Sequence, residues 1–338
     1  MNVAAGQRFL VTGSAGFIGF HTCQRLLKDG AEVLGIDNFS PYCDVRLKED
    51  RNALLEVHPA FSLERIDICD QERFQRAYET FRPDIVIHLA AQAGVRHSLV
   101  APSSYVASNV AGTLSVLECC RALPVQHLLI ASTSSVYGAS KNTPFRETSR
   151  TQSPLSLYAA TKAAGEQMAH AYSHLFQIPT TCFRFFTVYG PWGRPDMALY
   201  KFTEAMLRGR SIDLCNGGDM VRDFTYVDDL VEAVVRLTPL APDGSDLDTN
   251  GVRYRIVNIG GGAPERLSDY VVALEDALAL KAKKNLLPMQ PGDVPETHAA
   301  ADLLMRLTGY APSTSIKTGV KAFADWYRTY TRTEQVTP

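Results

Sequence analysis

The sequence predicts an α/β protein built on a doubly wound parallel sheet. Short apolar runs alternate with helical patterns through the first half of the chain, which is the order that β-α-β units produce. Two runs, Ile85-Val86-Ile87 and Leu128-Leu129-Ile130, are continuously apolar, as expected for strands covered on both faces. A glycine-rich turn directly follows the first run and opens a helical pattern, which is typical of ligand-binding turns in such sheets.

The individual elements can be placed from apolar periodicity and flanking turn residues. We expect strands over Arg8–Thr12, Glu32–Ile36, Phe61–Ile66, Ile85–Leu89, His127–Ala131 and Thr180–Phe185. We expect helices over Phe17–Lys28, Asp44–Val57, Gln71–Phe81, Ser103–Arg121 and Ser156–Phe176. The polar stretch Pro239–Gly251 is rich in turn residues and is expected to be an exposed loop.

The regular alternation ends near Gly190, where the turn-rich loop Gly190–Pro195 begins. We therefore expect a first domain over residues 1–190, which also receives later segments at about 211–260. Residues 191–338 are expected to form mainly a smaller α/β lobe that binds the substrate.

Composition excludes several classes of function. The net charge is −2 and no Lys/Arg block is present, so nucleic acid is not an expected partner. No apolar run approaches the ~18 residues of a membrane span, and Met1–Arg8 does not resemble a signal sequence. The seven cysteines form no C-x-x-C pair, which favours a reducing cytoplasm. His170 and His174 lack a third ligand, so no metal site is expected.

The glycine turn has the spacing G-x-x-G-x-x-G and lies between a strand and a helix, where backbone N–H groups can bind a pyrophosphate. The next strand ends in Asp37, an acid suited to the adenosine ribose, although a turn-capping role is the alternative. No arginine follows in Asn38-Phe39-Ser40, which favours NAD over NADP. The candidate cofactor residues are Gly13, Gly16, Phe17, Ile18, Gly19, Asp37, Asn38, Asp67, Ile68, Leu89, Ala90, Ala91, Tyr158 and Lys162.

Tyr158 and Lys162 are four residues apart on an expected helix and so share a face. At an effective dielectric of ~20, charges ~4 Å apart interact by about 4 kcal/mol, or roughly three pK units. We therefore expect the ammonium, together with the positive nicotinamide ring of the cofactor, to bring the tyrosine pKa near working pH. The hydroxyl cluster Ser132–Ser135 follows the fifth strand, where open α/β sheets bind ligands.

These motifs together resemble the extended short-chain dehydrogenases/reductases, which have a Rossmann-type fold, and among them the nucleotide-sugar epimerases. The resemblance runs essentially from end to end. It assigns the family's catalytic trio to Thr133, Tyr158 and Lys162. The segments 184–197, 222–229 and 290–297 are most similar to those of the UDP-glucuronate 4-epimerases.

The resemblance implies interconversion of UDP-glucuronate and UDP-galacturonate through a 4-keto sugar. Tyr158 would take the 4-hydroxyl proton while hydride passes to NAD, and Thr133 would hydrogen-bond the same oxygen. The keto intermediate is a β-keto acid that readily loses carbon dioxide. Arg194 is the candidate that restrains its carboxylate, because guanidinium binds carboxylate bidentately. Thr187 is a second candidate contact, and an exposed loop arginine is the alternative for Arg194.

Several relatives remain as alternatives, and the residues after Thr133 help to separate them. Dehydratases of this group carry Asp-Glu there and UDP-glucuronate decarboxylases carry Ser-Glu, whereas this chain has Ser134 and Ser135. The missing acid favours epimerisation. Thr187 replaces the Asn of galactose epimerases, which weakens a UDP-glucose 4-epimerase assignment. A dehydrogenase of this fold also stays open, whereas an NAD-sensing protein is disfavoured because such proteins commonly lose the Tyr/Lys pair.

The resemblance also implies which residues bind the nucleotide half of the substrate and how the protein assembles. Arg222 is expected at the diphosphate, although a salt bridge to Asp223 or Asp228 is the alternative. Gln290 and Asp293 are expected near the nucleoside, and Arg96 near the sugar or phosphate. Family members commonly dimerise through two helices, which correspond to Ser103–Arg121 and Ser156–Phe176, so a homodimer is expected.

Overall fold

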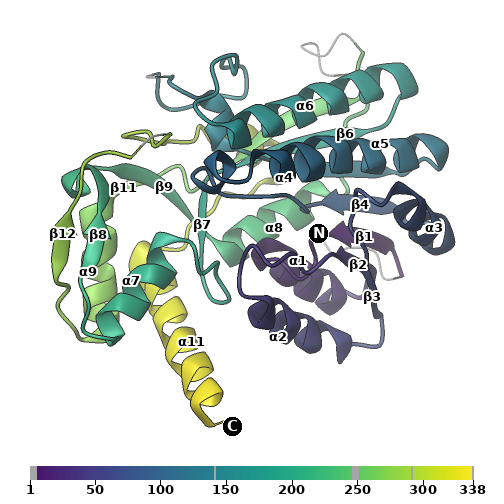
Figure 1. The fold of residues 1–338 in the computed structure, drawn as a ribbon. Helices are drawn as coiled ribbons and strands as arrows, with labels where there is room; N and C mark the ends of the chain where they lie inside the picture. The colour runs from purple at the N-terminus through teal and green to yellow at the C-terminus, as the bar shows by residue number, and fades with distance from the viewer. Residues whose placement is uncertain (1–5, 141, 246–250, 291, 337–338) are drawn as a thin grey trace.

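The computed structural model describes residues 6–140, 142–245, 251–290 and 292–336. A parallel sheet forms the centre of the molecule, with helices above and below it, and a smaller lobe lies at one side (Figure 1). Residues 246–250 of the loop predicted over Pro239–Gly251 lie outside the described residues, as do residues 1–5 of the N-terminal segment.

The large sheet has seven parallel strands in the order β10-β6-β5-β4-β1-β2-β3. This order confirms the doubly wound α/β fold and places the topological switch between β1 and β4, where such sheets bind ligands. The strands are β1 (Arg8–Thr12), β2 (Glu32–Asp37), β3 (Phe61–Arg65), β4 (Ile85–His88), β5 (His127–Thr133), β6 (Thr180–Phe185) and β10 (Tyr254–Ile259).

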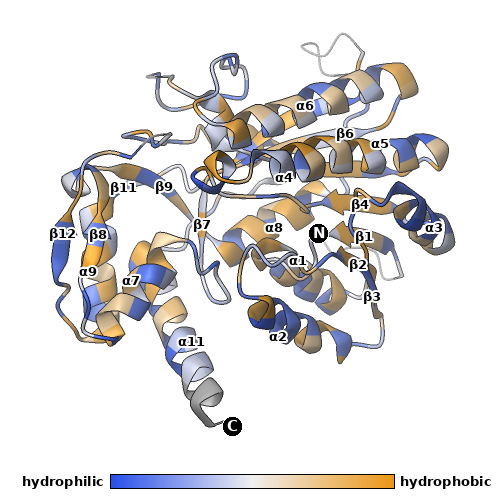
Figure 2. Cartoon of the chain, in the orientation of Figure 1, coloured by the Kyte–Doolittle hydropathy of each residue, from blue (hydrophilic) through white to orange (hydrophobic). Residues whose placement is uncertain are grey.

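Helices cover both faces of this sheet because its strands are apolar on both sides. Phe9 and Val11 of β1 join the core on one face, whereas Leu10 between them joins the core on the other. Figure 2 shows the strands largely in hydrophobic colours and the outer helix α2 largely in hydrophilic ones. The first face carries α1 (Phe17–Lys28), α2 (Val45–Glu56) and α8 (Val227–Leu237), and the second carries α3 (Gln71–Phe81), α5 (Gly112–Ala122) and α6 (Leu157–Phe176).

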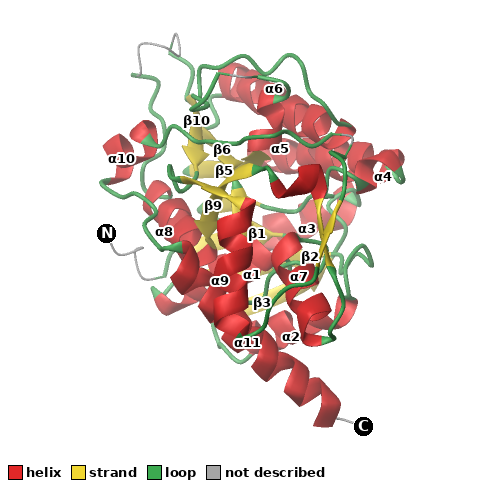
Figure 3. Ribbon diagram, turned by 90° about the vertical axis from the view of Figure 1, so that its left-hand side faces the viewer, coloured by secondary structure: helices red, strands yellow, loops and turns green. Residues whose placement is uncertain are grey.

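The smaller lobe has its own core, built on two short sheets and three helices (Figure 3). The stacked rings of Phe224 and Tyr270, with centroids 4.2 Å apart, join β9 to α9 within it. Its elements are β7 (Thr187–Tyr189), β8 (Ile212–Leu214), β9 (Val221–Tyr226), β11 (Pro264–Arg266), β12 (Lys284–Leu286), α7 (Ala198–Leu207), α9 (Leu267–Leu278) and α11 (Ile316–Val336). The short helix α10 (Asp302–Thr308) packs instead near α8.

The helix predicted over Ser103–Arg121 differs from the prediction, because it consists of three successive segments. They are α4 (Pro102–Val106), a π-helical turn (Ala107–Ala111) and α5. Asn109, which is buried in the π-helical turn, exchanges hydrogen bonds with the backbone of Gln92 at 2.8 and 3.0 Å and donates to Thr161 Oγ1 at 3.0 Å. These tertiary contacts explain the irregular turn, since local periodicity carries no information about them.

Within the described ranges, no helix combines the length and the apolar character that a membrane span requires.

A buried ion pair joins β5, β6 and α6. Arg184 of β6 donates to both carboxylate oxygens of Glu166 on α6, at 2.9 and 2.7 Å, and each side chain is only 2% exposed. Ser132 Oγ, one residue before Thr133, donates to the same carboxylate at 2.5 Å. The Arg184 guanidinium also lies 4.7 Å from the centre of the Tyr137 ring. The pair therefore fixes the end of β5 relative to the helix that carries Tyr158 and Lys162.

We predict that Glu166→Gln lowers the free energy of unfolding by about 3–5 kcal/mol, because it leaves the buried Arg184 charge uncompensated. Urea unfolding monitored by circular dichroism measures the change. The control is Glu72→Gln, which breaks the exposed pair of Glu72 with Arg76, whose side chains are 80% and 65% exposed. The control should change stability by less than about 1 kcal/mol. Equal losses in both variants would contradict the importance of the buried pair.

Candidate active site

One cavity of about 1210 Å³ lies along the carboxyl edge of the large sheet and extends into the smaller lobe. A volume above the ~300–1,000 Å³ typical of small-molecule pockets can hold a cofactor and a substrate together. The structure brings all the sequence-predicted site residues to its wall. On the cofactor side these are Gly13, Gly16, Phe17, Ile18, Gly19, Asp37, Asn38, Asp67, Ile68, Leu89, Ala90, Ala91, Tyr158 and Lys162, and on the substrate side Arg96, Thr133, Ser134, Ser135, Thr187, Arg194, Arg222, Gln290 and Asp293.

The glycine turn between β1 and α1 is packed too closely to hold side chains at its glycines. Gly13 has a left-handed φ of 74°, and a Cβ there would lie 2.8 Å from the Ala90 backbone nitrogen. A Cβ on Gly19 would lie 2.0 Å from the Gly13 carbonyl oxygen. The backbone is thus packed closely around the start of α1, where free N–H groups and the helix dipole favour a phosphate. This part of the cavity fits the pyrophosphate of a dinucleotide.

Asp37 ends β2 at the cavity wall, and its carboxylate is held by the backbone. Ala15 N–H donates to Oδ2 at 3.1 Å and Phe39 N–H donates to Oδ1 at 2.8 Å. Asp37 therefore caps a turn and also lines the cavity, so a turn-capping role is compatible with a contact to the adenosine ribose. Lys48 on α2 lies beside it, with Nζ 3.5 Å from Oδ1. Sequence analysis searched only the three residues after Asp37 and so missed this cation.

The candidate catalytic residues come from two elements that meet at the cavity. Thr133 is the last residue of β5, and Tyr158 lies in the first turn of α6. Ser156 begins this helix by accepting a hydrogen bond from Ala159 N–H at 3.1 Å, a typical N-cap. Lys162 follows one turn later on the same face and is buried. The three side chains therefore reach one part of the cavity from neighbouring elements.

The electrostatics of Tyr158 differ from the expectation. Burial raises the pKa of Tyr158, and the opposing influences come from the Thr133 hydroxyl and the Arg194 guanidinium. The expected lowering of the tyrosine pKa by Lys162 is therefore wrong for the protein by itself, because desolvation outweighs the nearby positive charges. Burial also lowers the pKa of Lys162 to about 8, against the raising effects of Cys182 and Glu166. Lys162 thus remains mostly protonated at neutral pH.

A chain of buried hydrogen bonds supports the loop that follows β4. Thr12 Oγ1 accepts from Ala90 N–H at 3.1 Å and lies 2.7 Å from His88 Nδ1. His88 Nε2 lies 3.0 Å from Thr113 Oγ1, which itself donates to the Asn109 carbonyl. Burial lowers the pKa of His88 to about 3, with a further lowering by Lys162, so the ring is neutral. The network fixes the cavity wall at Ala90 without adding charge.

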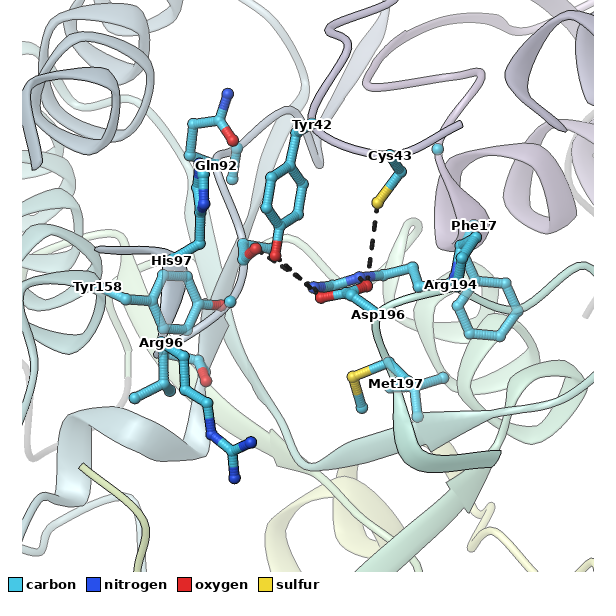
Figure 4. A pocket seen from close by; sticks show the side chains of 18 of the residues that line it. Phe17, Tyr42, Cys43, Gln92, Arg96, His97, Tyr158, Arg194, Asp196 and Met197 are labelled. Carbon is cyan, nitrogen blue, oxygen red and sulfur yellow. Dashed lines mark hydrogen bonds and ion pairs between the residues drawn. The ribbon is translucent and has the colours of Figure 1, made fainter. Parts of the chain in front are cut away.

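Arg194 is held by a carboxylate of its own loop. Its Nε and Nη2 donate to Asp196 at 2.9 and 2.6 Å, and Nη2 also donates to the Ala93 carbonyl at 3.2 Å. Tyr42 Oη, from the loop after β2, donates to the same Asp196 at 2.9 Å. Figure 4 shows Tyr42 and Arg194 pointing toward each other at the cavity, with Asp196 between them. The neighbouring carboxylate of Asp196, which sequence analysis did not consider, already occupies one edge of the guanidinium.

The far end of the cavity carries the residues expected at the nucleotide. Arg96 donates to Asp293 at 3.0 Å, which joins the loop after β4 to the loop after β12. Arg222 donates from Nη1 to the carbonyls of Val221 and Pro295, at 2.9 and 3.1 Å. The alternative of a salt bridge from Arg222 to Asp223 is wrong, because the Asp223 carboxylate accepts three backbone N–H groups instead, those of Gly261, Gly262 and Ala299.

Sequence analysis missed a group of polar residues that line this cavity. They lie on elements without a recognisable motif, and only tertiary structure brings them to the site. The spacing of Lys48 and Arg51, three residues apart on α2, was the one available signal, since it places both on one helix face. The missed residues include Ser40, Tyr42, Lys48, Arg51, Gln92, Asp196 and Lys201.

Comparison with known proteins identifies the family. The pattern of the NAD dependent epimerase/dehydratase family matches residues 9–260 of the chain. The chain therefore belongs to this family of nucleotide-cofactor enzymes, and the resemblance inferred from its motifs is confirmed.

Particular relatives point to one branch. The chain is 49% identical to a probable UDP-glucuronate 4-epimerase of Rhizobium meliloti (strain 1021), over 95% of this chain and 96% of that protein. It is 46% identical to UDP-glucuronate 4-epimerase 4 of Arabidopsis thaliana, over 96% of this chain and 76% of that protein. The structure of UDP-glucuronic acid 4-epimerase from Bacillus cereus, in complex with UDP-glucuronic acid and NAD, matches with a TM-score of 0.87 at 35% identity. That match covers 96% of this chain and all (100%) of the solved chain.

We predict that Gly19→Ala weakens NAD binding at least roughly tenfold and destabilises the fold by about 1–3 kcal/mol, because the added methyl group forces the turn apart. Isothermal titration with NAD and thermal unfolding measure the two effects. The control is Gly165→Ala in α6, where the nearest heavy atom to the new Cβ would be Thr113 Cγ2 at 3.9 Å. The control should gain roughly 0.5–1 kcal/mol in stability and bind NAD normally. NAD binding by Gly19→Ala at the parent affinity would refute the close-packed turn as the cofactor site.

Proposed function

We propose that the protein is a UDP-glucuronate 4-epimerase that interconverts UDP-glucuronate and UDP-galacturonate. The single observation that carries this proposal is the composition of the cavity around the trio. Thr133, Tyr158 and Lys162 meet there, whereas Ser134 and Ser135 stand where a dehydratase or decarboxylase would carry an acid. The names of the most similar relatives support the same substrate.

The proposed chemistry divides between the cofactor and the chain. When bound, NAD would supply the acceptor for the hydride of the sugar C4 and would supply that hydride again to the opposite face once the keto sugar had turned over. Tyr158 holds and moves the proton of the 4-hydroxyl at its phenolic oxygen, and Thr133 hydrogen-bonds the same sugar oxygen. Because burial raises the pKa of Tyr158, negative charge on its oxygen depends on nearby cations. Arg194 supplies one such cation, and the positively charged nicotinamide ring of NAD would supply a second.

The substrate carboxylate is the group that separates this reaction from that of the glucose epimerases. Arg194 and Thr187 line the cavity beside the trio and are the proposed contacts. Asp196 already occupies the Nε and Nη2 edge of Arg194, so the substrate would meet the Nη1 side. Contact with the Nη1 side alone would hold the substrate carboxylate in one orientation. That orientation controls whether the keto acid can lose carbon dioxide.

The nucleotide half is proposed to occupy the far end of the cavity. Arg222 would face the diphosphate, since its guanidinium has carbonyl partners and no carboxylate partner among the described residues. Gln290, Asp293 and Arg96 would contact the nucleoside and the adjoining phosphate. Asp37, together with the glycine turn, would bind NAD rather than NADP, because a carboxylate repels a 2′-phosphate.

We expect the purified protein to convert UDP-glucuronate to UDP-galacturonate without added cofactor, as followed by proton NMR. Tyr158→Phe should slow this conversion by about 10²–10⁴-fold, because it removes the group that carries the proton. Tyr172→Phe is the matched control, since Tyr172 lies on the same helix but donates to Glu118 away from the cavity. The control should turn over at the parent rate.

Each product identifies a different outcome of this experiment. A UDP-pentose would contradict the proposed restraint by Arg194 and indicate a decarboxylase. Net NADH release would indicate a dehydrogenase. Turnover of UDP-glucose alone would assign the enzyme to the glucose epimerases. Unchanged turnover in Tyr158→Phe would contradict the catalytic mechanism.

We also propose that the protein is a homodimer of the cytoplasm. All seven cysteines are free, which suits a reducing compartment. Helices α4, α5 and α6 lie side by side on one outer face (Figure 1). Large apolar side chains of these helices are exposed, since Val106 of α4 is 48%, Leu114 of α5 40% and Leu175 of α6 66% exposed. Two such helical faces, packed against each other, would bury these side chains.

We predict that Leu114→Glu converts the dimer to a monomer, because it places a charge in the centre of the proposed contact. Gel filtration with light scattering measures the mass. Leu54→Glu is the control, since Leu54 on α2 is 45% exposed on a different face. A monomeric parent protein, or loss of the dimer in both variants, would rule out this interface.

A further inference from the structure

Arg51 is a buried cation that the proposed mechanism does not use. It lies on α2, it is only 3% exposed, and it lines the cavity beside the glycine turn. Long charged side chains are rarely buried without a partner of opposite charge. Arg51 forms no ion pair within the described part of the chain.

The partners of Arg51 are backbone carbonyls from two different parts of the molecule. Nη1 donates to the carbonyl of Ala15, inside the glycine turn, at 3.1 Å. Nη2 donates to the carbonyls of Trp192 and Gly193, at 2.5 and 3.5 Å. The remaining nitrogen, Nε, is buried without any hydrogen-bond partner. One guanidinium thus connects the candidate cofactor turn to the loop that leads to Arg194.

The charge on Arg51 is not neutralised by these contacts. Burial lowers its pKa to about 10, so the group remains a cation at neutral pH. Carbonyl dipoles compensate a buried charge only partly, and an uncompensated charge costs free energy. Cys43 and Asp37 attract the charge, but their attraction does not outweigh the effect of burial. An anion near the Ala15 turn would therefore be stabilised by Arg51 and would stabilise it in return.

The loop that receives the other end of Arg51 is strained and closely held. Trp192 has a left-handed φ of 60°, which is costly for a bulky residue and persists only where the surroundings enforce it. Three consecutive carbonyls of this loop point into the large domain, since Pro191 O lies 2.9 Å from His21 Nε2 and the next two face Arg51. Burial lowers the pKa of His21 to about 4, so Arg51 is the cationic member of this anchor.

We propose that Arg51 is a positioning residue that couples dinucleotide binding to the placement of Arg194. This inference rests on the proposed use of NAD. The pyrophosphate at the glycine turn compensates the Arg51 charge through space. The charged guanidinium in turn holds Trp192 and Gly193, and so fixes the residue that follows them. Cofactor binding and binding of the sugar carboxylate are therefore thermodynamically linked through one side chain.

Two variants separate this coupling from a purely structural anchor. Arg51→Met keeps the length of the side chain without its charge, and Arg51→Lys keeps the charge with fewer directed N–H groups. Arg46→Met, on the same helix with a side chain 75% exposed, is the control for the change in net charge. Circular dichroism and thermal unfolding of the cofactor-stripped full chain show that each variant folds.

The first measurement is the affinity for NAD, followed by titration calorimetry and by the rise in melting temperature that NAD produces. We expect Arg51→Met to bind NAD roughly 10- to 100-fold more weakly, as for the loss of a charge-assisted interaction. Arg51→Lys should recover most of this loss, and Arg46→Met should bind like the parent. If Arg51 only anchors the loop, the melting temperature without NAD falls in both Arg51 variants but the NAD affinity stays within twofold of the parent, and the proposal is overturned.

The second measurement is the coupling itself, made in a Tyr158→Phe background so that bound UDP-glucuronate reacts too slowly to disturb the titration. We expect NAD to tighten UDP-glucuronate binding severalfold with Arg51 present and to leave it unchanged with Arg51→Met. Equal tightening in both proteins would overturn the coupling. A parent protein that binds no NAD would instead refute the proposed function, so the two failures are distinguishable.

Discussion

The arrangement of the candidate active site depends on the buried ion pair between Arg184 and Glu166. It ties three elements together, because Glu166 lies on α6, Arg184 lies on β6, and Ser132 at the end of β5 donates to the same carboxylate. The hydroxyl of Thr133 and the phenol of Tyr158 are presented by two of these elements. Replacing such a pair by apolar residues often costs little, whereas removing one partner costs several kcal/mol. The main effect of the pair is therefore to fix the relative positions of β5, β6 and α6, and its contribution to net stability is smaller.

Several cationic side chains line the same cavity, whereas the carboxylates beside them already have cationic partners. In the proposed arrangement, Lys162 lies at the sugar end, Arg222 at the nucleotide end and Arg51 at the cofactor turn. The carboxylates of Asp196 and Asp293 are each already paired with an arginine. Buried cations with carbonyl partners are costly in an isolated chain but favourable beside phosphates. Two bound molecules, each with a pyrophosphate, would neutralise these cationic side chains. The electrostatics thus agree with a dinucleotide and a nucleotide sugar bound together.

The sequence was sufficient to predict the fold and the residues of recognisable motifs. The predicted ends of Phe17–Lys28, Gln71–Phe81 and Thr180–Phe185 coincide with those of the structure, because apolar periodicity and capping residues act locally. Tyr42 and Asp196 could not be predicted, because their positions depend on loops that only tertiary packing brings together. The helix that carries Arg51 was predicted, but its buried contacts with Ala15 and Trp192 also depend on tertiary packing. The pKa of Tyr158 was predicted in the wrong direction for a related reason. Spacing reveals a neighbouring charge, but it does not reveal how far both groups are removed from water.

The Asp196 carboxylate offers a physical reason why a site for a β-keto acid need not release carbon dioxide. Decarboxylation requires the bond to the carboxylate carbon to align with the adjacent carbonyl π system, so the direction of that bond decides the outcome. A guanidinium free to rotate would follow the substrate and hold its carboxylate in any direction. Asp196, itself held by Tyr42, binds the Nε and Nη2 edge and so fixes the plane of Arg194. With the proposed binding of the substrate carboxylate by Arg194, the protein would set the direction of that carboxylate, and specificity for the uronate would arise from an arginine that is restrained before the substrate arrives.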